Sequence, residues 1–249
     1  MMRAAIVVLV AACGTPVATP RPSCELPPST VLHHEGTAIV EHWILDDAAR
    51  WLAEAPAVGP ATARFRAAIR AKVDVTPAAI FARQIARYAG SSDPMELGEV
   101  HNTTLVRDGK VGMLRPMSCL EAALYERQTA RYPEETHPTE FHGFVLRRGT
   151  QLDVVMLASD QPFPPKVGLA MPHVDPALAA GWTLWGHLHD HTFEFTADRN
   201  AALGTPAPST TDVQFYRNFA DSGLERALVT NGFVTVEIRA SELPQLSGR

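Results

Sequence analysis

The sequence predicts an α/β fold in which helices flank a mixed sheet, with a small helical region ahead of it. Three observations predict this fold. Helical and strand patterns alternate through residues 116–249. Residues 36–115 show mainly helical spacing of their apolar side chains. The hydrophobic and charged fractions, 46% and 20%, are typical of a globular protein, so disorder is not expected.

The first residues have the layout of a secretory signal. Arg3 gives a short positive region, and residues 4–12 form an apolar run, too short to span a bilayer, that leads to Cys13. The tetrad Val10-Ala11-Ala12-Cys13 resembles the bacterial lipobox. That resemblance implies a signal peptide over residues 1–12, export, and a lipid on Cys13. The lipid would anchor the protein to the bacterial membrane, facing the periplasm or the cell surface. A plain cleaved signal is the alternative.

Residues 13–35 are rich in Pro, Thr and Ser and predict an extended tether between the lipid and the folded domain. Two cysteines remain besides Cys13. In an oxidising periplasm Cys24 and Cys119 could form a disulfide. The alternative is that Cys24 lies in a mobile tether while Cys119 is a small buried apolar side chain.

The 36–115 region is predicted to be helical with one hairpin. Apolar spacing, a Thr76-Pro77 N-cap and a stop at Gly90 predict three helices, over residues 39–55, 61–73 and 77–90. Two apolar runs that flank Arg107-Asp108-Gly109-Lys110 predict the hairpin. We expect no catalytic chemistry in this region, and interpret its histidines as solvated or core residues: His33, His34 and His42.

The elements predicted for residues 116–249 alternate between strand and helix. A capping box at Ser118-Cys119-Leu120-Glu121 begins the first helix, and Asn231-Gly232 is typical of a hairpin turn. In chain order we expect a helix to residue 131, strands at 141–147 and 152–157, a short helix near 175–180, a strand at 182–185, a helix at 209–221, and strands at 227–230 and 233–238.

A candidate metal site follows the predicted strand at 182–185. On an extended segment, the imidazoles of His187 and His189 project to the same side. Paired imidazoles are a usual beginning of a zinc site, which needs about three protein ligands and an open position. Two surface histidines at a strand end are the alternative. Downstream, Ser209 is a typical helix N-cap. Asp212 would then lie in the first turn of that helix and point toward the element against which the helix start packs.

Glu140, His187-x-His189 and Ser209-x-x-Asp212 stand in an order that resembles the JAMM (JAB/MPN) metalloprotease signature. Their surroundings are similar as well, since a helix precedes the strand that begins at Glu140 and a hairpin follows the Asp212 helix. The resemblance covers residues 118–238 and implies a JAMM/deaminase-like sheet for the 116–249 domain.

The resemblance also implies roles. His187, His189 and Asp212 would bind Zn²⁺, Glu140 would act as general base and acid, and Ser209 would donate a hydrogen bond to the developing oxyanion. The implied function is zinc-dependent hydrolysis of amide or isopeptide bonds in a peptide or protein substrate of the cell envelope.

Two features depart from the family pattern. Leu188 and Asp190 stand where the family has serine and proline, and the connection over residues 190–208 is longer than usual. This insert could be a lid over the site or the source of a substitute ligand, for which His191 is the candidate.

Two other functions stay open. The domain could be a JAMM-like binding lipoprotein without catalytic activity. Gly186-His187-Leu188-His189 also resembles the last motif of calcineurin-like metallophosphoesterases, although their D-x-H and G-N-H-[DE] blocks are missing. Nucleic acid is not expected as a partner, because the net charge is −5 and no Lys/Arg cluster occurs.

Overall fold

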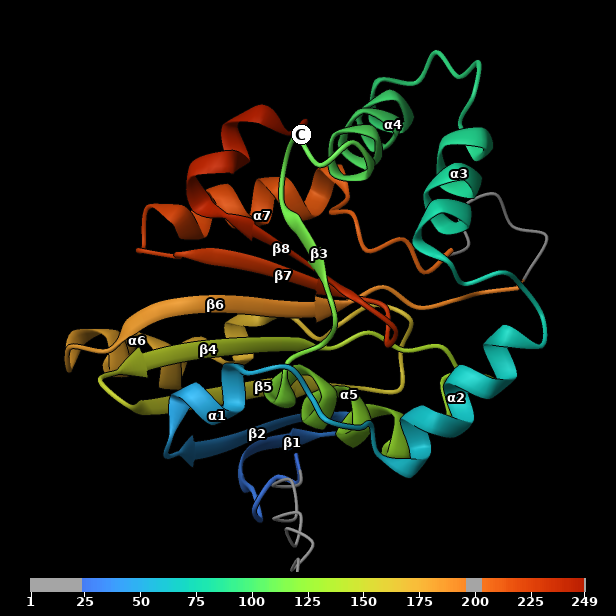
Figure 1. Ribbon diagram of the computed structural model, residues 1–249. Helices are drawn as coiled ribbons and strands as arrows, with labels where there is room; N and C mark the ends of the chain where they lie inside the picture. The colour runs from blue at the N-terminus through green and yellow to red at the C-terminus, as the bar shows by residue number, and fades with distance from the viewer. Residues whose placement is uncertain (1–23, 196–202, 249) are drawn as a thin grey trace, which may run out of the picture.

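The computed structural model describes residues 24–195 and 203–248. Within them, one open sheet has the strand order β1-β2-β5-β4-β6-β7-β8-β3 (Figure 1). β6 and β7 pair in parallel and the other neighbours are antiparallel. The strands are β1 (Thr30–Glu35), β2 (Ala38–Leu45), β3 (Met113–Arg115), β4 (His142–Arg148), β5 (Gln151–Ala158), β6 (Thr183–Asp190), β7 (Arg226–Thr230) and β8 (Thr235–Arg239).

Helices cover both faces of this sheet. One apolar core lies between the sheet and α1, α2 and α5, and a second lies between the sheet and α4, α6 and α7. The predicted sheet with flanking helices is therefore present. The helices are α1 (Ala48–Leu52), α2 (Pro60–Arg70), α3 (Pro77–Arg87), α4 (Pro94–Arg107), α5 (Cys119–Arg131), α6 (Met171–Ala179) and α7 (Thr210–Ala220).

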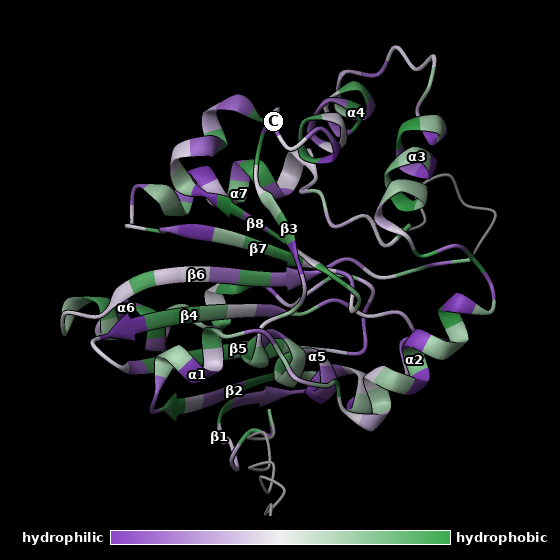
Figure 2. Ribbon diagram, viewed as in Figure 1, coloured by the Kyte–Doolittle hydropathy of each residue, from purple (hydrophilic) through white to green (hydrophobic). Residues whose placement is uncertain are grey.

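α2 shows how a local pattern produces one of these layers. Hydrophilic and hydrophobic residues mix along its ribbon (Figure 2), and Phe65 and Ile69, one turn apart, are both fully buried. Its N-cap is Gly59, which has no side chain to accept a hydrogen bond. Glu126 of α5 caps the helix instead, because its carboxylate accepts hydrogen bonds from the Ala61 and Thr62 amides at 3.0 and 2.8 Å. The cap therefore also fixes the contact between α2 and α5.

Two predictions for the 36–115 region are wrong. The stretch predicted as a helix over residues 39–55 begins instead with β2. The β-branched and aromatic residues of β2 favour a strand, and residues 39–45 all pair with β5. The predicted hairpin is instead α4 followed by β3. Asp93 accepts a hydrogen bond from the Met95 amide and Pro94 stands at the first helical position, so the helix begins before the first expected strand.

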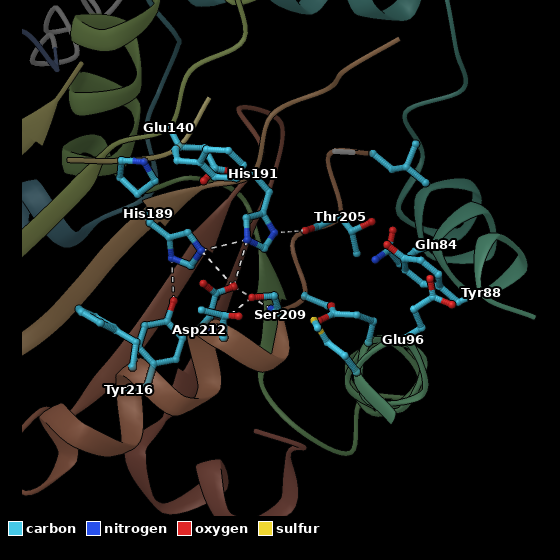
Figure 3. A pocket seen from close by; sticks show the side chains of 18 of the residues that line it. Gln84, Tyr88, Glu96, Glu140, His189, His191, Thr205, Ser209, Asp212 and Tyr216 are labelled. Carbon is cyan, nitrogen blue, oxygen red and sulfur yellow. Dashed lines mark hydrogen bonds and ion pairs between the residues drawn. The ribbon is translucent and has the colours of Figure 1, made fainter. Parts of the chain in front are cut away.

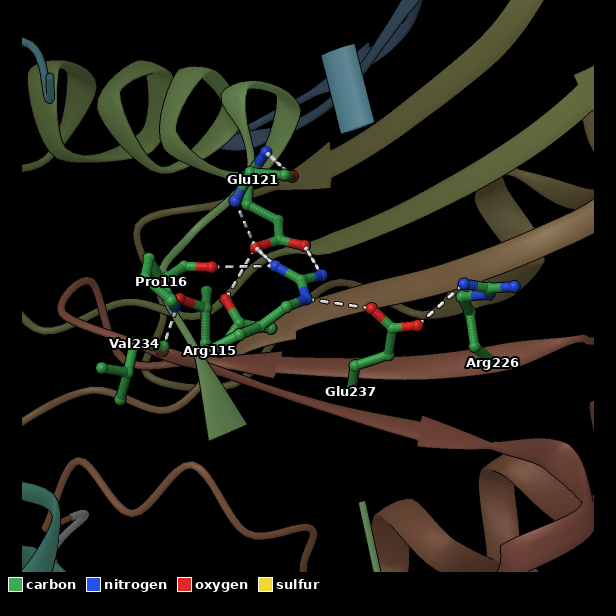
Figure 4. A network of polar contacts seen from close by, with 9 residues as sticks. Arg115, Pro116, Glu121, Arg226, Val234 and Glu237 are labelled. Atoms are coloured by element: carbon green, nitrogen blue, oxygen red, sulfur yellow. Dashed lines mark hydrogen bonds and ion pairs between the residues drawn. The ribbon is translucent and has the colours of Figure 1, made fainter. Parts of the chain in front are cut away.

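The 36–115 region also contributes to both edges of the sheet. β2 pairs with β5 on one side, and β3 pairs with β8 on the other. Arg115 of β3 fastens that edge, because its guanidinium donates to Glu121 of α5 and to Glu237 of β8, which also accepts from Arg226 (Figure 4). The predicted boundary at residue 115 therefore does not divide the sheet.

The elements expected from residue 116 onward are present. Ser118 and Glu121 form the predicted capping box of α5, and a second capping box begins α7. The main difference is β6, which continues to Asp190 and so carries the candidate histidines within the sheet instead of beyond a strand end. α6 also begins earlier than expected, at Met171.

Cys24 and Cys119 form a disulfide, which joins the segment before β1 to the first residue of α5. The expected signal peptide, Cys13 and the predicted tether as far as residue 23 lie outside the described residues, while Thr30–Glu35, also predicted as tether, forms β1 of the sheet. Among the helices of the described ranges, none is long and apolar enough to cross a membrane.

Candidate metal centre

β6 brings three histidines to one face of the sheet. His187, His189 and His191 follow the two-residue period of an extended chain, while Leu188 points into the core on the opposite face. β6 lies between β4 and β7, so these side chains emerge from the middle of the sheet and not from an edge. A central strand is a rigid base for a site.

His189, His191 and Asp212 converge on one point (Figure 3). Their closest atoms are the two Nε2 atoms, 3.0 Å apart, and Asp212 Oδ2, which is 3.4 Å from His189 Nε2 and 3.2 Å from His191 Nε2. Atoms bound to one zinc ion lie roughly 3–4 Å apart, given bonds of about 2.0–2.2 Å. The triad could therefore hold a metal ion.

Asp212 reaches this point because of how α7 begins. Ser209 Oγ accepts from the Asp212 amide at 3.0 Å, and Asp212 Oδ2 accepts from the Ser209 amide at 2.7 Å. The helix start is docked on α4, whose Glu99 accepts from the Thr210 amide at 2.8 Å. Capping and docking together place the carboxylate at the end of β6.

The hydrogen bonds behind the histidines favour metal binding. The Thr205 carbonyl accepts from His191 Nδ1 at 2.6 Å, so that nitrogen carries a proton and leaves Nε2 to face His189 and Asp212. Tyr216 Oη lies 2.7 Å from His189 Nδ1, which fixes that ring as well. Such partners orient the imidazoles of metal sites.

The centre of the triad suits a proton or a positive charge. With Nδ1 protonated, a neutral His191 points a lone pair at a carboxylate oxygen and at a second imidazole. A proton on either Nε2 atom, or a cation between them, relieves that contact. Burial lowers the pKa of His191, but the hydrogen bond and charge of Asp212, together with the charge of Glu140, outweigh it and raise the pKa to about 10. A divalent cation fits the same point.

His187 is not part of this triad. Its ring lies one register further into the sheet, with its centroid 6.0 Å from that of His189, and contacts Phe144, Phe215 and His142 at 4.9, 4.6 and 4.8 Å. Neither ring nitrogen has a hydrogen-bond partner in the part of the chain that the structure describes. Burial lowers the pKa of His187 well below its ordinary value, so the ring is neutral. Of the two histidines expected to bind zinc, the structure places only His189 beside Asp212.

Glu140 and Ser209 both line the cavity in front of the triad. Glu140 lies next to the two imidazoles (Figure 3). Burial raises the pKa of Glu140 well above its ordinary value, and the charges of Asp190 and Asp212 add to the rise, while His191 opposes it. A raised pKa suits a carboxyl group that both accepts and returns a proton near neutral pH.

Asp190 holds the Glu140 segment against β6. It points away from the metal triad, and its Oδ1 accepts from the Phe141 amide at 2.7 Å. Burial raises the pKa of Asp190 to about 7, against the lowering effect of that amide. The residue that stands where the JAMM pattern has proline therefore fixes the position of Glu140 relative to His189 and His191.

The cavity is large enough for part of a peptide. Its volume is about 570 Å³. The sheet side carries the triad, and α3 and α4 form the facing wall with Gln84, Tyr88 and Glu96 (Figure 3). The helical region in which we expected no chemistry thus supplies one wall of the cavity.

Three residues of the site were not predicted from the sequence: His142, Thr205 and Tyr216. Only Tyr216 had a usable signal, since it follows Asp212 by four residues and so shares a helix face with it. From the sequence, His191 is predicted only as a substitute ligand. It lies two residues after His189, so the period of a strand already places it on the same face as His187 and His189.

No protein-family model matches the chain, and searches of curated proteins and of solved structures gave no match. The residues and geometry of the site are therefore what indicates a function.

Proposed function

We propose that this chain is a zinc-dependent hydrolase of amide or isopeptide bonds, with His189, His191 and Asp212 as metal ligands. One observation carries the proposal: the ligand atoms of the triad lie 3.0–3.4 Å apart at the floor of a cavity that Glu140 and Ser209 also line. Two imidazoles and one carboxylate are a usual ligand set of catalytic zinc. A bound Zn²⁺ supplies Lewis acidity and lowers the pKa of water toward 7.

The chain's own groups supply the remaining chemistry. Glu140 accepts a proton from the attacking water and returns it to the leaving amine, work that contributes about 10²–10⁴-fold to rate. Ser209 Oγ accepts from the Asp212 amide, so its own proton is free to stabilise a developing oxyanion. Tyr216 and the Thr205 carbonyl keep the imidazoles oriented.

The JAMM resemblance supports this proposal with one change. The histidine pair moves two residues along, from His187-x-His189 to His189-x-His191, while Glu140 and Ser209-x-x-Asp212 stay in place. Export and a lipid on Cys13 remain part of the proposal, and they make peptides or proteins of the cell envelope the substrates. Release of the Cys13→Ser variant from the membrane fraction is expected. A wild-type protein that is already soluble would refute the anchor.

The test is the Glu140→Gln variant. It should keep the zinc content of the wild type and lose hydrolysis of a pool of internally quenched peptides that contains both α-linked and Lys isopeptide-linked members. Glu54→Gln, at an exposed position away from the site, is the matched control. Loss of zinc together with activity would make Glu140 a ligand. A wild type that binds zinc but cleaves no member of the pool would favour a binding protein instead.

A further inference from the structure

A second cluster of metal-ligating side chains lies on the same sheet face, over different strands. Asp153 of β5 is 5% exposed and is flanked by His42 of β2 and His173 of α6. Asp153 Oδ1 lies 3.0 Å from His42 Nε2 and 3.5 Å from His173 Nε2. The three residues come from elements as far apart as residues 42 and 173, so the cluster is a product of the fold.

The polar chemistry of this cluster is incomplete. Both imidazoles direct Nε2 at the same carboxylate oxygen, and within the described residues the His173 nitrogen is buried without a hydrogen bond. A buried nitrogen that lacks such a bond is unfavourable. Among the described residues, the ion-pair partners of Asp153 are these two histidines, with no Lys or Arg. Two imidazole nitrogens and one carboxylate oxygen within 4.8 Å suit a divalent transition metal.

α6 is a short helix held mainly by apolar contacts. It has no side-chain cap, contains Pro176 in its interior and buries Val174 fully, while Met171, Ala177 and Leu178 pack in part against the core. Proline inside a helix removes a hydrogen bond and weakens the helix. A bond from His173 to a metal shared with two sheet residues would fasten α6 to β2 and β5.

We propose that His42, Asp153 and His173 form a second metal site of the zinc class. The side chains of His42 and His173 are 15% and 30% exposed, so solvent reaches the fourth coordination position. The site shares no residue with the proposed catalytic triad. It departs from our interpretation of His42 as a solvated or core residue. α6 belongs to the crossover from β5 to β6, which also contains Phe163 and Pro164, two residues that line the catalytic cavity. A metal bound here would therefore restrain the segment that carries them.

The experiment measures metal content site by site. The full chain is purified, stripped with a chelator, reloaded with Zn²⁺ and desalted before elemental analysis. The wild type should hold two equivalents, and His173→Gln and His191→Gln should hold one each. His34→Gln, at an exposed position on β1, should keep two. His173 is on a surface helix and partly exposed, so its variant is expected to fold.

A thermal measurement separates metal binding from folding. Addition of Zn²⁺ to metal-free His191→Gln should raise its melting temperature, and the same addition should have no effect on a variant that also carries His173→Gln. If His173→Gln keeps the zinc content of the wild type, the proposal is overturned and the cluster is an ion-pair network. If zinc is retained in His191→Gln and lost in His173→Gln, this proposal stands while the proposed catalytic site fails.

Discussion

Replacing Tyr216 by phenylalanine tests the geometry of the catalytic triad without touching a ligand. Tyr216 is fully buried, and its hydroxyl lies 2.7 Å from His189 Nδ1. Burial raises the pKa of Tyr216 well above its ordinary value, with Asp212 and Glu140 adding to the rise, so the side chain is a neutral phenol. In this state its oxygen can accept the Nδ1 proton of His189 and leave Nε2 free for a metal.

Two independent magnitudes apply to the change. Loss of an outer hydrogen-bond partner lowers metal affinity about 10–100-fold. Leaving a buried donor without an acceptor costs about 1–3 kcal/mol, and about 1.4 kcal/mol corresponds to tenfold in affinity. The energy corresponds to about 5–150-fold, a range that contains the first one, so Tyr216→Phe should bind Zn²⁺ about 10–100-fold more weakly than the wild type.

The assay is competition for Zn²⁺ against a chromophoric chelator, in the His173→Gln background so that only one site is measured. Tyr132→Phe, at a partly exposed position away from the site, is the matched control and should leave the affinity unchanged. If Tyr216→Phe binds Zn²⁺ as tightly as the control, the inference that the Tyr216 hydroxyl orients His189 as a metal ligand is refuted.

Four further predictions follow from the structure. Metal binding at the triad must displace the proton of His191, whose pKa Asp212 raises to about 10 against the effect of burial, so Zn²⁺ affinity measured by the same competition should rise by about tenfold per pH unit near neutrality. With the metal removed, His191 stabilises the fold because its pKa is raised in the folded protein. This stabilisation should be complete below pH 6.5, the ordinary pKa of the side chain, and denaturant titrations should show it declining as the pH rises toward 10. Glu126→Gln should lower the free energy of unfolding by about 1–3 kcal/mol, because the carboxylate caps α2 through two amides and the Thr62 hydroxyl; an unchanged urea midpoint would contradict this. Gly232→Ala should destabilise the protein by at least about 1–3 kcal/mol in the same titration, since φ is +78° and a Cβ there would lie 2.5 Å from the Tyr125 ring; wild-type stability would show that the ring can move.

Local patterns predicted the C-terminal elements because their signals are local. A capping box at Ser118 and a turn at Asn231-Gly232 depend on neighbours within four residues, and both elements formed where expected. β2 failed for the opposite reason. Its residues 38–45 satisfy helical spacing, and only pairing with β5, more than 100 residues away, makes them a strand. That partner is invisible to any short window of sequence.

The same distinction explains which part of the catalytic site could be predicted. The period of a strand puts His187, His189 and His191 on one face, so the sequence permits either adjacent pair to meet Asp212. The choice depends on where α7 begins relative to the end of β6. Glu99 on α4 accepts from the Thr210 amide, and Asn102 on the same helix donates to the Pro208 carbonyl at 3.3 Å. α4 thus fixes the helix start beside His189 and His191. A region in which we expected no chemistry determines which histidines meet the carboxylate.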